Sequence, residues 1–377
     1  MPQRRVILFA HDGFGLGHLR RIANIAAAIQ GPCAALVVSG LRMASWIVAP
    51  TCELLQLPGW NSLRSHRSAY WNRAPWLDID LDGAIQLRAD LLKATFDVFK
   101  PEAILVDYLP FGQRGELCEA LNQSTAKKYL IHRGIIDSSD RPLLGQDAVR
   151  SWSRTYDRIL IAAERQIVDV ATEYGFDPET ALKVEYVGYI ATKTRDRADV
   201  RTARGLGGRQ RWVVCSGGGG VGAEEFLRHC VKVAAVMPEV EFDVVFGPQA
   251  KEEIEVLASA PDNCRVRREA ADLADLHASA DVVVTSGGYN STLEAARGGA
   301  RLIVHPCHTG TDDEQMSQAT RLQAFYPVHI LNGATKLHDA LTRALDHCRE
   351  ERPVFPFETA GAERIRDILC SDLDSGL

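Results

Sequence analysis

The chain has 377 residues, of which 46% are hydrophobic and 24% charged, and its formal charge is −6 at pH 7. This length exceeds one ordinary domain core, and an acidic balance without a polybasic stretch argues against nucleic acid as a partner. No apolar run approaches the roughly 18 to 20 residues of a membrane span. The nine scattered cysteines indicate reduced thiols in a cytoplasmic protein.

The first half alternates strand-like apolar runs with helix-like segments, which is typical of a parallel, doubly wound α/β sheet. Helices are expected at 18–30, 41–48 and 81–99. Strands are expected at 6–10, 34–39, 52–57, 103–107, 128–132, 158–162 and 184–187. A polar stretch at 59–80 interrupts the alternation and holds Trp60, Tyr70, Trp71, Trp76 and several arginines. Its aromatic rings either stack on an acceptor sugar or pack between domains, and both interpretations stay open.

The second half repeats the alternation after a polar, arginine-rich stretch at 188–210, where we place the domain boundary. Helices are expected at 223–236, 251–258, 272–278 and 291–298, with further helices toward the C-terminus. Strands are expected at 212–215, 241–246, 264–266, 282–285, 301–305 and 328–331. Two Rossmann-like domains in series explain this pattern better than one domain with insertions.

Two glycine turns in the second half each follow a buried strand and lead into a helix. The first is Ser216 to Gly222, with five glycines in seven residues, and the second holds Ser286, Gly287 and Gly288. Such turns point free backbone N–H groups and a helix N-terminus at one spot, as a diphosphate requires. Glu294, one turn inside the second helix, could accept hydrogen bonds from ribose hydroxyls. A packing turn and a flexible linker are the plain alternatives.

A third glycine turn, His11 to Leu19, follows the first strand and contains Gly13, Gly15 and Gly17. Its Gly-x-Gly-x-Gly pattern departs from the dinucleotide fingerprint. The acidic residue that NAD would require at the end of the second strand is replaced by Ser39 and Gly40. NAD is therefore the poorer fit.

Beyond the strand at 301–305 the chain reads HPCHTGTDDEQMSQA over 305–319. With the two glycine turns before it, this segment resembles the donor half of GT-B glycosyltransferases, specifically family 28 and the MurG-like N-acetylglucosaminyltransferases. The resemblance spans about 212–325 and the N-terminal glycine turn. It implies a GT-B fold, in which two Rossmann-like α/β domains face each other across a cleft. Its domains would be an acceptor domain at 1–190, a nucleotide-sugar domain at 191–355, and a helix at 356–377 that crosses back to the first.

The resemblance also assigns roles to residues of the donor site. The diphosphate would lie against Ser216, Gly217, Gly218 and Gly219 on one side and Ser286, Gly287 and Gly288 on the other. Glu294 would hold the ribose, and Glu314 with Gln315 would hold hydroxyls of the sugar. Main-chain groups of Val266 or Arg267 would read the base, uracil by family. Gln318 stands where the family usually has Asn, and Asp-Glu-Gln replaces the commoner Asp-Gln-Gln, so the sugar stays open.

In that family the N-terminal turn ends in a histidine near the reacting centre, which makes His18 our first choice of general base. An imidazole can accept a proton from an acceptor hydroxyl at neutral pH. The glycines of this turn, Gly13, Gly15 and Gly17, would face donor phosphates or acceptor. Asp12, His11 and Asp107 are the reserve candidates. Asp107 ends a strand, so it could orient an imidazole or hold a polyhydroxylated acceptor, whereas His132 fits a structural role equally well.

No metal or other cofactor is expected. Asp78, Asp80 and Asp82 match an Asp-x-Asp string and the start of a calcium loop, but the twelfth loop position is Ala89, which cannot supply a carboxylate. These aspartates instead predict an N-cap and first turn of the helix at 81–99. His305 and His308 flank Cys307 without further ligands at zinc spacing, which favours pocket lining or packing.

The sequence, with this resemblance, thus predicts a metal-independent hexosyltransferase that moves a sugar from a nucleotide sugar to a small, soluble, polar acceptor, and the resemblance implies that the transfer inverts. UDP-N-acetylglucosamine is the candidate donor, and an antibiotic intermediate such as an aminoglycoside is the candidate acceptor. The acidic clusters at 78–82 and 137–140 would attract a cationic acceptor. A nucleotide-sugar hydrolase or epimerase and a non-catalytic nucleotide-sugar-binding protein are the alternatives. The oligomeric state is open, with a homodimer among the options.

Overall fold

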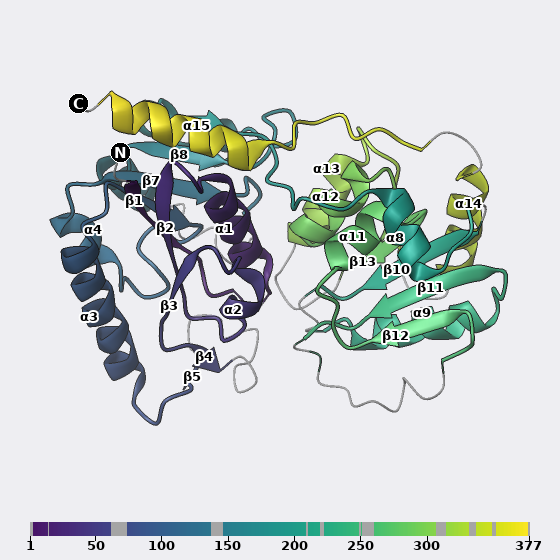
Figure 1. The fold of residues 1–377 in the computed structure, drawn as a ribbon. Helices are drawn as coiled ribbons and strands as arrows, with labels where there is room; N and C mark the ends of the chain where they lie inside the picture. The colour runs from purple at the N-terminus through teal and green to yellow at the C-terminus, as the bar shows by residue number, and fades with distance from the viewer. Residues whose placement is uncertain are drawn as a thin grey trace. The chain divides into compact units, whose positions relative to one another are not determined.

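The computed structural model describes residues 3–13, 15–61, 74–136, 146–208, 210–218, 222–248, 250, 260–306, 314–331, 337–348 and 352–375. The chain divides into two compact units (Figure 1). The first comprises Met1–Phe14, His18–Ile190 and Glu358–Leu377, and the second comprises Gly15–Gly17 and Ala191–Phe357. No helix in the described part of the chain combines the length and apolar character needed to cross a membrane.

The first unit is built on a seven-stranded sheet in the order β3-β2-β1-β6-β7-β8-β9, with parallel pairing throughout. Its strands are β1 (Arg4–Phe9), β2 (Cys33–Ser39), β3 (Glu53–Gln56), β6 (Ala103–Asp107), β7 (Lys127–His132), β8 (Arg158–Ile161) and β9 (Val184–Tyr186). A separate antiparallel pair joins β4 (Trp60–Asn61) to β5 (Ala74–Pro75). The expected parallel α/β sheet is thus confirmed, and the β4–β5 pair was not expected.

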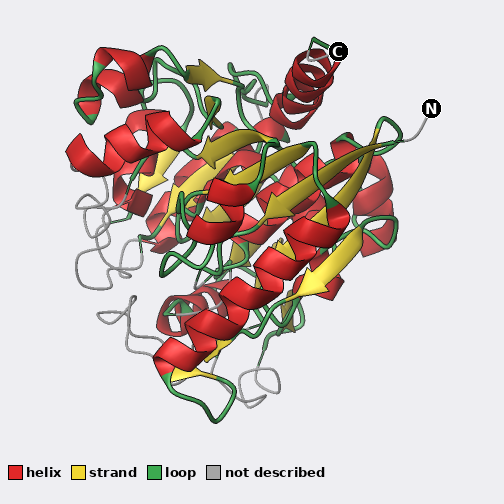
Figure 2. Ribbon diagram, turned by 90° about the vertical axis from the view of Figure 1, so that its left-hand side faces the viewer, coloured by secondary structure: helices red, strands yellow, loops and turns green. Residues whose placement is uncertain are grey.

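Helices lie against this sheet, and Figure 2 shows several of them in front of strands that remain visible between them. They are α1 (Gly17–Ala28), α2 (Ala44–Ile47), α3 (Leu81–Phe99), α4 (Cys118–Gln123), α5 (Gln146–Thr155), α6 (Val170–Glu173), α7 (Pro178–Ala181) and α15 (Gly361–Asp374). The N-cap of α3 is Asp80, whose Oδ1 accepts a hydrogen bond from the Gly83 N–H at 2.7 Å. Asp78 and Asp82 are exposed beside it, which confirms the predicted N-cap and first turn.

The second unit holds a six-stranded parallel sheet in the order β12-β11-β10-β13-β14-β15. Its strands are β10 (Arg211–Ser216), β11 (Val240–Val245), β12 (Cys264–Arg267), β13 (Val282–Thr285), β14 (Arg301–Val304) and β15 (Val328–Ile330). Its helices are α8 (Arg197–Arg204), α9 (Glu224–Ala235), α11 (Leu273–Ser279), α12 (Tyr289–Arg297), α13 (Glu314–Leu322) and α14 (Leu337–His347). The helix predicted at 251–258 lies outside the described residues.

The arginine-rich stretch before β10 contains a helix, α8, rather than only a polar connection. Asp196 caps it by accepting the Ala198 N–H at 2.7 Å. Its buried arginines explain the composition, since Arg201 pairs with Asp281 and Arg204 with Asp243. Both carboxylates belong to the second unit, so α8 is part of that unit's packing.

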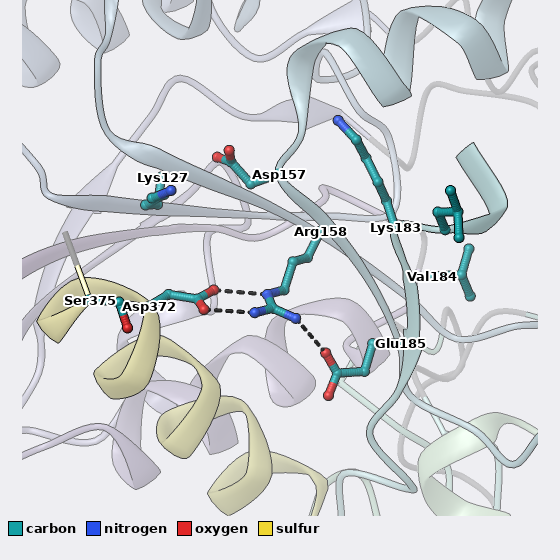
Figure 3. A pocket seen from close by; sticks show the side chains of 9 residues that line it. Lys127, Asp157, Arg158, Lys183, Val184, Glu185, Asp372 and Ser375 are labelled. Carbon is teal, nitrogen blue, oxygen red and sulfur yellow. Dashed lines mark hydrogen bonds and ion pairs between the residues drawn. The ribbon is translucent and has the colours of Figure 1, made fainter. Parts of the chain in front are cut away.

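The last helix, α15, belongs to the first unit, although the whole second unit separates it in sequence. It buries Ile365, Leu369 and Leu373, and Asp372 adds a hydrogen-bonded ion pair. The Asp372 side chain accepts two hydrogen bonds from Arg158, at 2.7 and 2.8 Å (Figure 3). It accepts a third from the Tyr129 hydroxyl at 2.9 Å. Arg158 also pairs with Glu185 at 3.0 Å. Asp372, Arg158 and Glu185 line a surface pocket of about 490 Å³ whose charged groups largely neutralise one another.

We expect Asp372→Ala to lower the free energy of unfolding by about 1–2 kcal/mol, because it leaves Arg158 and the Tyr129 hydroxyl without their shared acceptor. Burial acts to raise the pKa of Asp372, but hydrogen bonds from Arg158 and Tyr129 outweigh it and lower the pKa. The stabilisation is therefore present above the ordinary carboxyl pKa of about 3.9 and lost as pH falls through the lower folded value.

Urea denaturation at pH 7 and at acid pH measures this effect. Asp367→Ala is the matched control on the same helix, because the Asp367 side chain is 67% exposed and pairs with its sequence neighbour Arg366. Equal stabilities of the two variants at pH 7 would contradict the assignment.

Candidate functional site

Both sheets reverse their strand order at one point, between β1 and β6 in the first unit and between β10 and β13 in the second. Open α/β sheets bind ligands beyond the carboxyl ends of the strands at such a point. In the first unit, His11 and Asp12 follow β1 and Asp107 ends β6. In the second, Ser216 ends β10 and Ser286 follows β13. The topology therefore puts the predicted residues of each unit where ligands bind.

In the first unit the structure brings His18, Asp107 and Arg21 together. The His18 Nδ1 lies 2.6 Å from the Asp107 Oδ2, and Arg21 donates to the Asp107 Oδ1 from Nε at 2.8 Å and from Nη2 at 2.5 Å. Asp107 is fully buried and Arg21 is 1% exposed. Because an ionised carboxylate only accepts, His18 carries its proton on Nδ1, and its Nε2 is left with a lone pair.

The electrostatics of this cluster keep the imidazole neutral and the carboxylate charged. Burial is the largest effect on His18 and lowers its pKa to about 4, although the Asp107 charge acts in the opposite direction. Burial would raise the pKa of Asp107, but the charges of Arg21 and His18 outweigh it and lower the pKa. A neutral imidazole beside an ionised carboxylate is the state that a general base requires.

Aromatic rings surround His18. The Tyr108 ring lies 5.0 Å from the His18 ring and stacks on His132 at the same distance, and the Arg133 guanidinium lies 5.0 Å from the Tyr108 ring centre. Tyr108 adopts a left-handed backbone conformation with φ of 68°, which is uncommon outside glycine and clusters at functional sites. His132 thus packs within the cluster, where burial lowers its pKa to about 3.

Asp12 occupies a different network in the first unit. Its carboxylate accepts the Gly40 N–H at 2.8 Å and an Arg88 hydrogen bond at 2.9 Å, and Arg88 also pairs with Glu116 at 3.1 Å. Asp12, Arg88 and Glu116 are all at most 3% exposed. This arrangement supports a role for Asp12 in holding the sheet edge. In the neighbouring turn, the Gly13 N–H bonds the His11 carbonyl, Gly15 has open space beside its Cα, and Gly17 begins α1.

The two glycine turns of the second unit differ in how they could hold an anion. A Cβ on Gly217 would lie 2.6 Å from the Phe246 carbonyl oxygen, so this position has no room for a side chain. Gly218 follows it, and Gly219 lies outside the described residues. The helix beyond, α9, carries Glu224 and Glu225 in its first turn, and these carboxylates oppose an anion at its N-terminus.

The turn before α12 is the better anion site. Gly288 is the N-cap of α12, no side chain caps the helix, and its first turn carries no acidic residue. Gly287 has φ of +91°, and a Cβ there would lie 2.7 Å from the Val304 side chain, so only glycine fits. That Cβ would also lie 3.4 Å from the Gln315 carbonyl, which brings the start of α13 beside the turn. The first-turn N–H groups of α12, which have no acceptor within the helix, and the positive end of its dipole therefore point toward this turn.

Glu294 lies in α12 and is 4% exposed. Its Oε2 lies 3.0 Å from the His277 Nδ1, and its Oε1 accepts the Thr192 hydroxyl at 3.3 Å. The His277 Nε2 in turn lies 2.9 Å from the Ser216 Oγ, and Ser216 is fully buried. The Ser216 side chain is thus directed at His277, and any phosphate contact of Ser216 would come from its main chain.

The two candidates for reading the base differ in their main-chain direction. The Arg267 carbonyl accepts the Phe246 N–H at 3.0 Å, and the Arg267 side chain pairs with buried Asp243 at 2.9 Å. The main-chain N–H and carbonyl groups of successive residues point to opposite sides of a strand. The N–H and carbonyl of Val266 therefore point away from β11, at the outer side of the edge strand β12. Val266 is therefore better placed than Arg267 to offer main-chain groups to a ligand.

The remaining candidates lie at the start of α13 and the end of β14. Glu314 and Gln315 are the first residues of α13 and are half-buried. The His305 ring stacks on Phe226 at 4.4 Å, in line with packing. Cys307, His308, Trp71, Tyr70 and the cluster at 137–140 lie outside the described residues. Within the ranges that are described, no group of His, Cys, Asp and Glu side chains is arranged to hold a metal ion.

Three residues of these clusters were not identified from the sequence. Arg21 lies one helical turn after His18, and this spacing could have indicated that both face one partner. Tyr108 follows Asp107 directly, but nothing in its sequence indicates a left-handed backbone. His277 lies 17 residues before Glu294, on another helix, and only the tertiary structure brings them together.

Comparison with protein-family models gives a match for residues 213–369 to the glycosyltransferase family 28 C-terminal domain. This range includes both glycine turns of the second unit and Glu294. A search of curated protein sequences gives no match to the chain.

Solved structures of glycosyltransferases share the fold over the whole chain. The glycotransferase of kitacinnamycin aligns with a TM-score of 0.63 at 16% identity, covering 100% of this chain and 96% of that one. SnogD from Streptomyces nogalater aligns with a TM-score of 0.63 at 14% identity, covering 98% and 100%. A protein described as a UDP-N-acetylglucosamine 2-epimerase from Listeria monocytogenes aligns with a TM-score of 0.64 at 11% identity, covering 99% and 98%.

These structural similarities establish the fold of the two Rossmann-like units, and the family model carries the assignment of the second. Residues 213–369 match the glycosyltransferase family 28 C-terminal domain, and the chain as a whole has the GT-B fold of two Rossmann-like units.

Proposed function

We propose that the protein transfers a sugar from a nucleotide sugar, UDP-linked, to a hydroxyl or amine of a small soluble acceptor, with inversion and without a metal. The observation that carries the proposal is the 2.6 Å contact between His18 and Asp107 at the strand-order reversal of the first sheet. It supplies a neutral, oriented imidazole in a protein whose other unit belongs to a donor-binding family.

In this reaction the His18 Nε2 takes the proton from the acceptor as the acceptor atom bonds to the anomeric carbon. The bond from that carbon to the diphosphate oxygen breaks, and the nucleoside diphosphate leaves with the electron pair. Asp107 stabilises the imidazolium that forms, and Arg21 keeps Asp107 ionised beforehand. Attack from the side opposite the leaving group inverts the anomeric configuration.

The second unit holds the donor. The N–H groups at the uncapped start of α12 and the turn at Gly287 and Gly288 stabilise the departing diphosphate. Glu294 accepts hydrogen bonds from the ribose, main-chain groups of Val266 read the base, and Glu314 with Gln315 hold the sugar. Proximity of the Gln315 main chain to Gly287 supports this grouping.

The acceptor is the least constrained part of the proposal. Two structurally similar proteins are the glycotransferase of kitacinnamycin and the calicheamicin glycosyltransferase CalG4, which supports an antibiotic intermediate. Exposed Asp78 and Asp82 add negative charge that would attract a cationic acceptor such as an aminoglycoside. The described cysteines are all free, in line with a reducing, cytoplasmic setting.

A nucleotide-sugar epimerase or hydrolase is the second candidate, favoured by the similarity to the protein described as an epimerase. Incubation with UDP-N-acetylglucosamine alone separates the two, because a transferase without acceptor leaves the donor largely intact. Release of free sugar or an epimerised donor, at a rate that added acceptors do not change, would favour the second candidate.

Thermal unfolding against UDP, GDP, dTDP, NAD and UDP-N-acetylglucosamine tests the donor site. UDP at about 100 times its dissociation constant should add roughly 2.7 kcal/mol of stability. We expect Glu294→Ala to remove this gain, whereas Asp339→Ala, at an exposed position on α14, should keep it. A response to NAD alone would exclude the proposed donor.

Substitution of His18 and of Asp107 tests the assignment of the general base. We expect His18→Ala and Asp107→Asn each to lower kcat by about 10²- to 10⁴-fold, while donor binding is retained. His338→Ala, at an exposed position on α14, is the matched histidine control. Unchanged turnover in His18→Ala would exclude this residue as the base.

The pH dependence gives a further check on the same group. Because the His18 pKa is lowered to about 4, kcat/KM of the wild-type protein should fall on the acid side near pH 4, where the imidazole becomes protonated. Asp107 acts to raise that pKa, so Asp107→Asn should move the acid limb to lower pH. A limb at the ordinary histidine pKa of about 6.5 would contradict the assignment.

A further inference from the structure

Three polar side chains from three elements of the second unit form a continuous, buried hydrogen-bond network. Ser216 ends β10, His277 lies in α11 and Glu294 lies in α12. The Ser216 Oγ is 2.9 Å from the His277 Nε2, and the His277 Nδ1 is 3.0 Å from the Glu294 Oε2. Ser216 and His277 are fully buried, and Glu294 is 4% exposed. Such a network is costly to bury unless each polar group has a hydrogen-bond partner, so its geometry is strongly constrained.

The hydrogen-bond directions follow from the carboxylate. An ionised Glu294 only accepts, so the His277 Nδ1 carries a proton and donates it, and the His277 Nε2 then accepts from the Ser216 hydroxyl. The Thr192 hydroxyl holds the other oxygen of Glu294 at 3.3 Å. Both oxygens are therefore held, and a carboxylate with about four lone-pair sites can still accept from a ribose hydroxyl on an oxygen that His277 already holds.

The order serine, histidine and carboxylate is also that of a hydrolytic triad, but burial argues against this use. A nucleophilic serine has to contact the carbon that it attacks, and the Ser216 side chain is fully buried. Ser216 also opens the first glycine turn, while Glu294 belongs to the helix that follows the second. This hydrogen-bond network therefore connects the two glycine turns that would surround the diphosphate.

We propose that His277 is a positioning residue for the donor, which holds the Glu294 carboxylate in the orientation that accepts the ribose hydroxyls. Through Ser216 it also couples that carboxylate to the strand end from which the first glycine turn starts. This inference rests on the proposed nucleotide-sugar site. His277 itself touches no substrate and acts through Glu294.

The test compares UDP with dUDP, which lacks the ribose 2′-hydroxyl, by calorimetric titration of the full chain. One hydrogen bond to a charged group corresponds to roughly a tenfold or larger preference of the wild-type protein for UDP. We expect His277→Leu to bind UDP at least about tenfold more weakly and to lose most of this preference, because Glu294 loses its donor. In turnover, KM for the donor should rise while kcat at saturating donor stays within about threefold.

Two conservative variants separate positioning from general packing. His277→Asn offers an amide N–H near the position of Nδ1 and should retain the preference for UDP over dUDP. His277→Gln offers its amide near the position of Nε2 and should lose that preference. His338→Asn, at an exposed position on α14, is the control for histidine substitution and should behave as the wild-type protein.

The outcomes distinguish this inference from the proposed function. If Glu294→Ala loses the UDP preference but both conservative variants at His277 keep it, the inference is overturned and the donor site stands. If Glu294→Ala keeps UDP binding and its preference, the proposed ribose contact itself is wrong. If His277→Leu does not fold, the contrast between the Asn and Gln variants decides, and equal UDP preferences in the two overturn the inference.

Discussion

Buried carboxylates on parallel strands, or in the turn just after one, are the constraint on which this structure depends. Each one would cost several kcal/mol if it were left alone, and each has an arginine partner. Asp107 is held by Arg21, Asp12 by Arg88 and Asp243 by Arg204. Each pair joins a helix to a strand or to the turn after one, and of these three pairs the first also includes a histidine, His18. The candidate base His18 is thus added to a type of buried arginine–carboxylate pair that recurs in this protein.

The two units use opposite electrostatics at their strand-order reversals. In the first, a buried imidazole is kept neutral beside an ionised carboxylate, which suits proton transfer. In the second, an uncapped helix and a glycine turn leave positive dipole ends unmatched, which suits an anionic leaving group. The proposed reaction would therefore place proton acceptance in the first unit and stabilisation of the departing diphosphate in the second.

The elements that follow from local pattern were predictable from the sequence. The strands at 103–107 and 282–285 and the helix at 81–99 are found at the predicted residues, because their hydrophobic period and caps are local. The helix α8 was missed because its buried arginines look polar in sequence, and their partners Asp281 and Asp243 are distant along the chain. Likewise, Asp107 was only a reserve candidate until the parallel pairing of β1 with β6 brought it beside the start of α1. The link from His277 to Glu294 carries no sequence signature at all.

The docking of α15 also constrains the order in which the protein can be made. The first unit includes residues 358–377, and Asp372 joins Arg158 and Tyr129 of its sheet. Those residues leave the ribosome only after the entire second unit has been synthesised. During synthesis, the strands of the first unit therefore lack α15 until the second unit has emerged from the ribosome. Of the two units, the first thus begins to be synthesised earlier and is completed later.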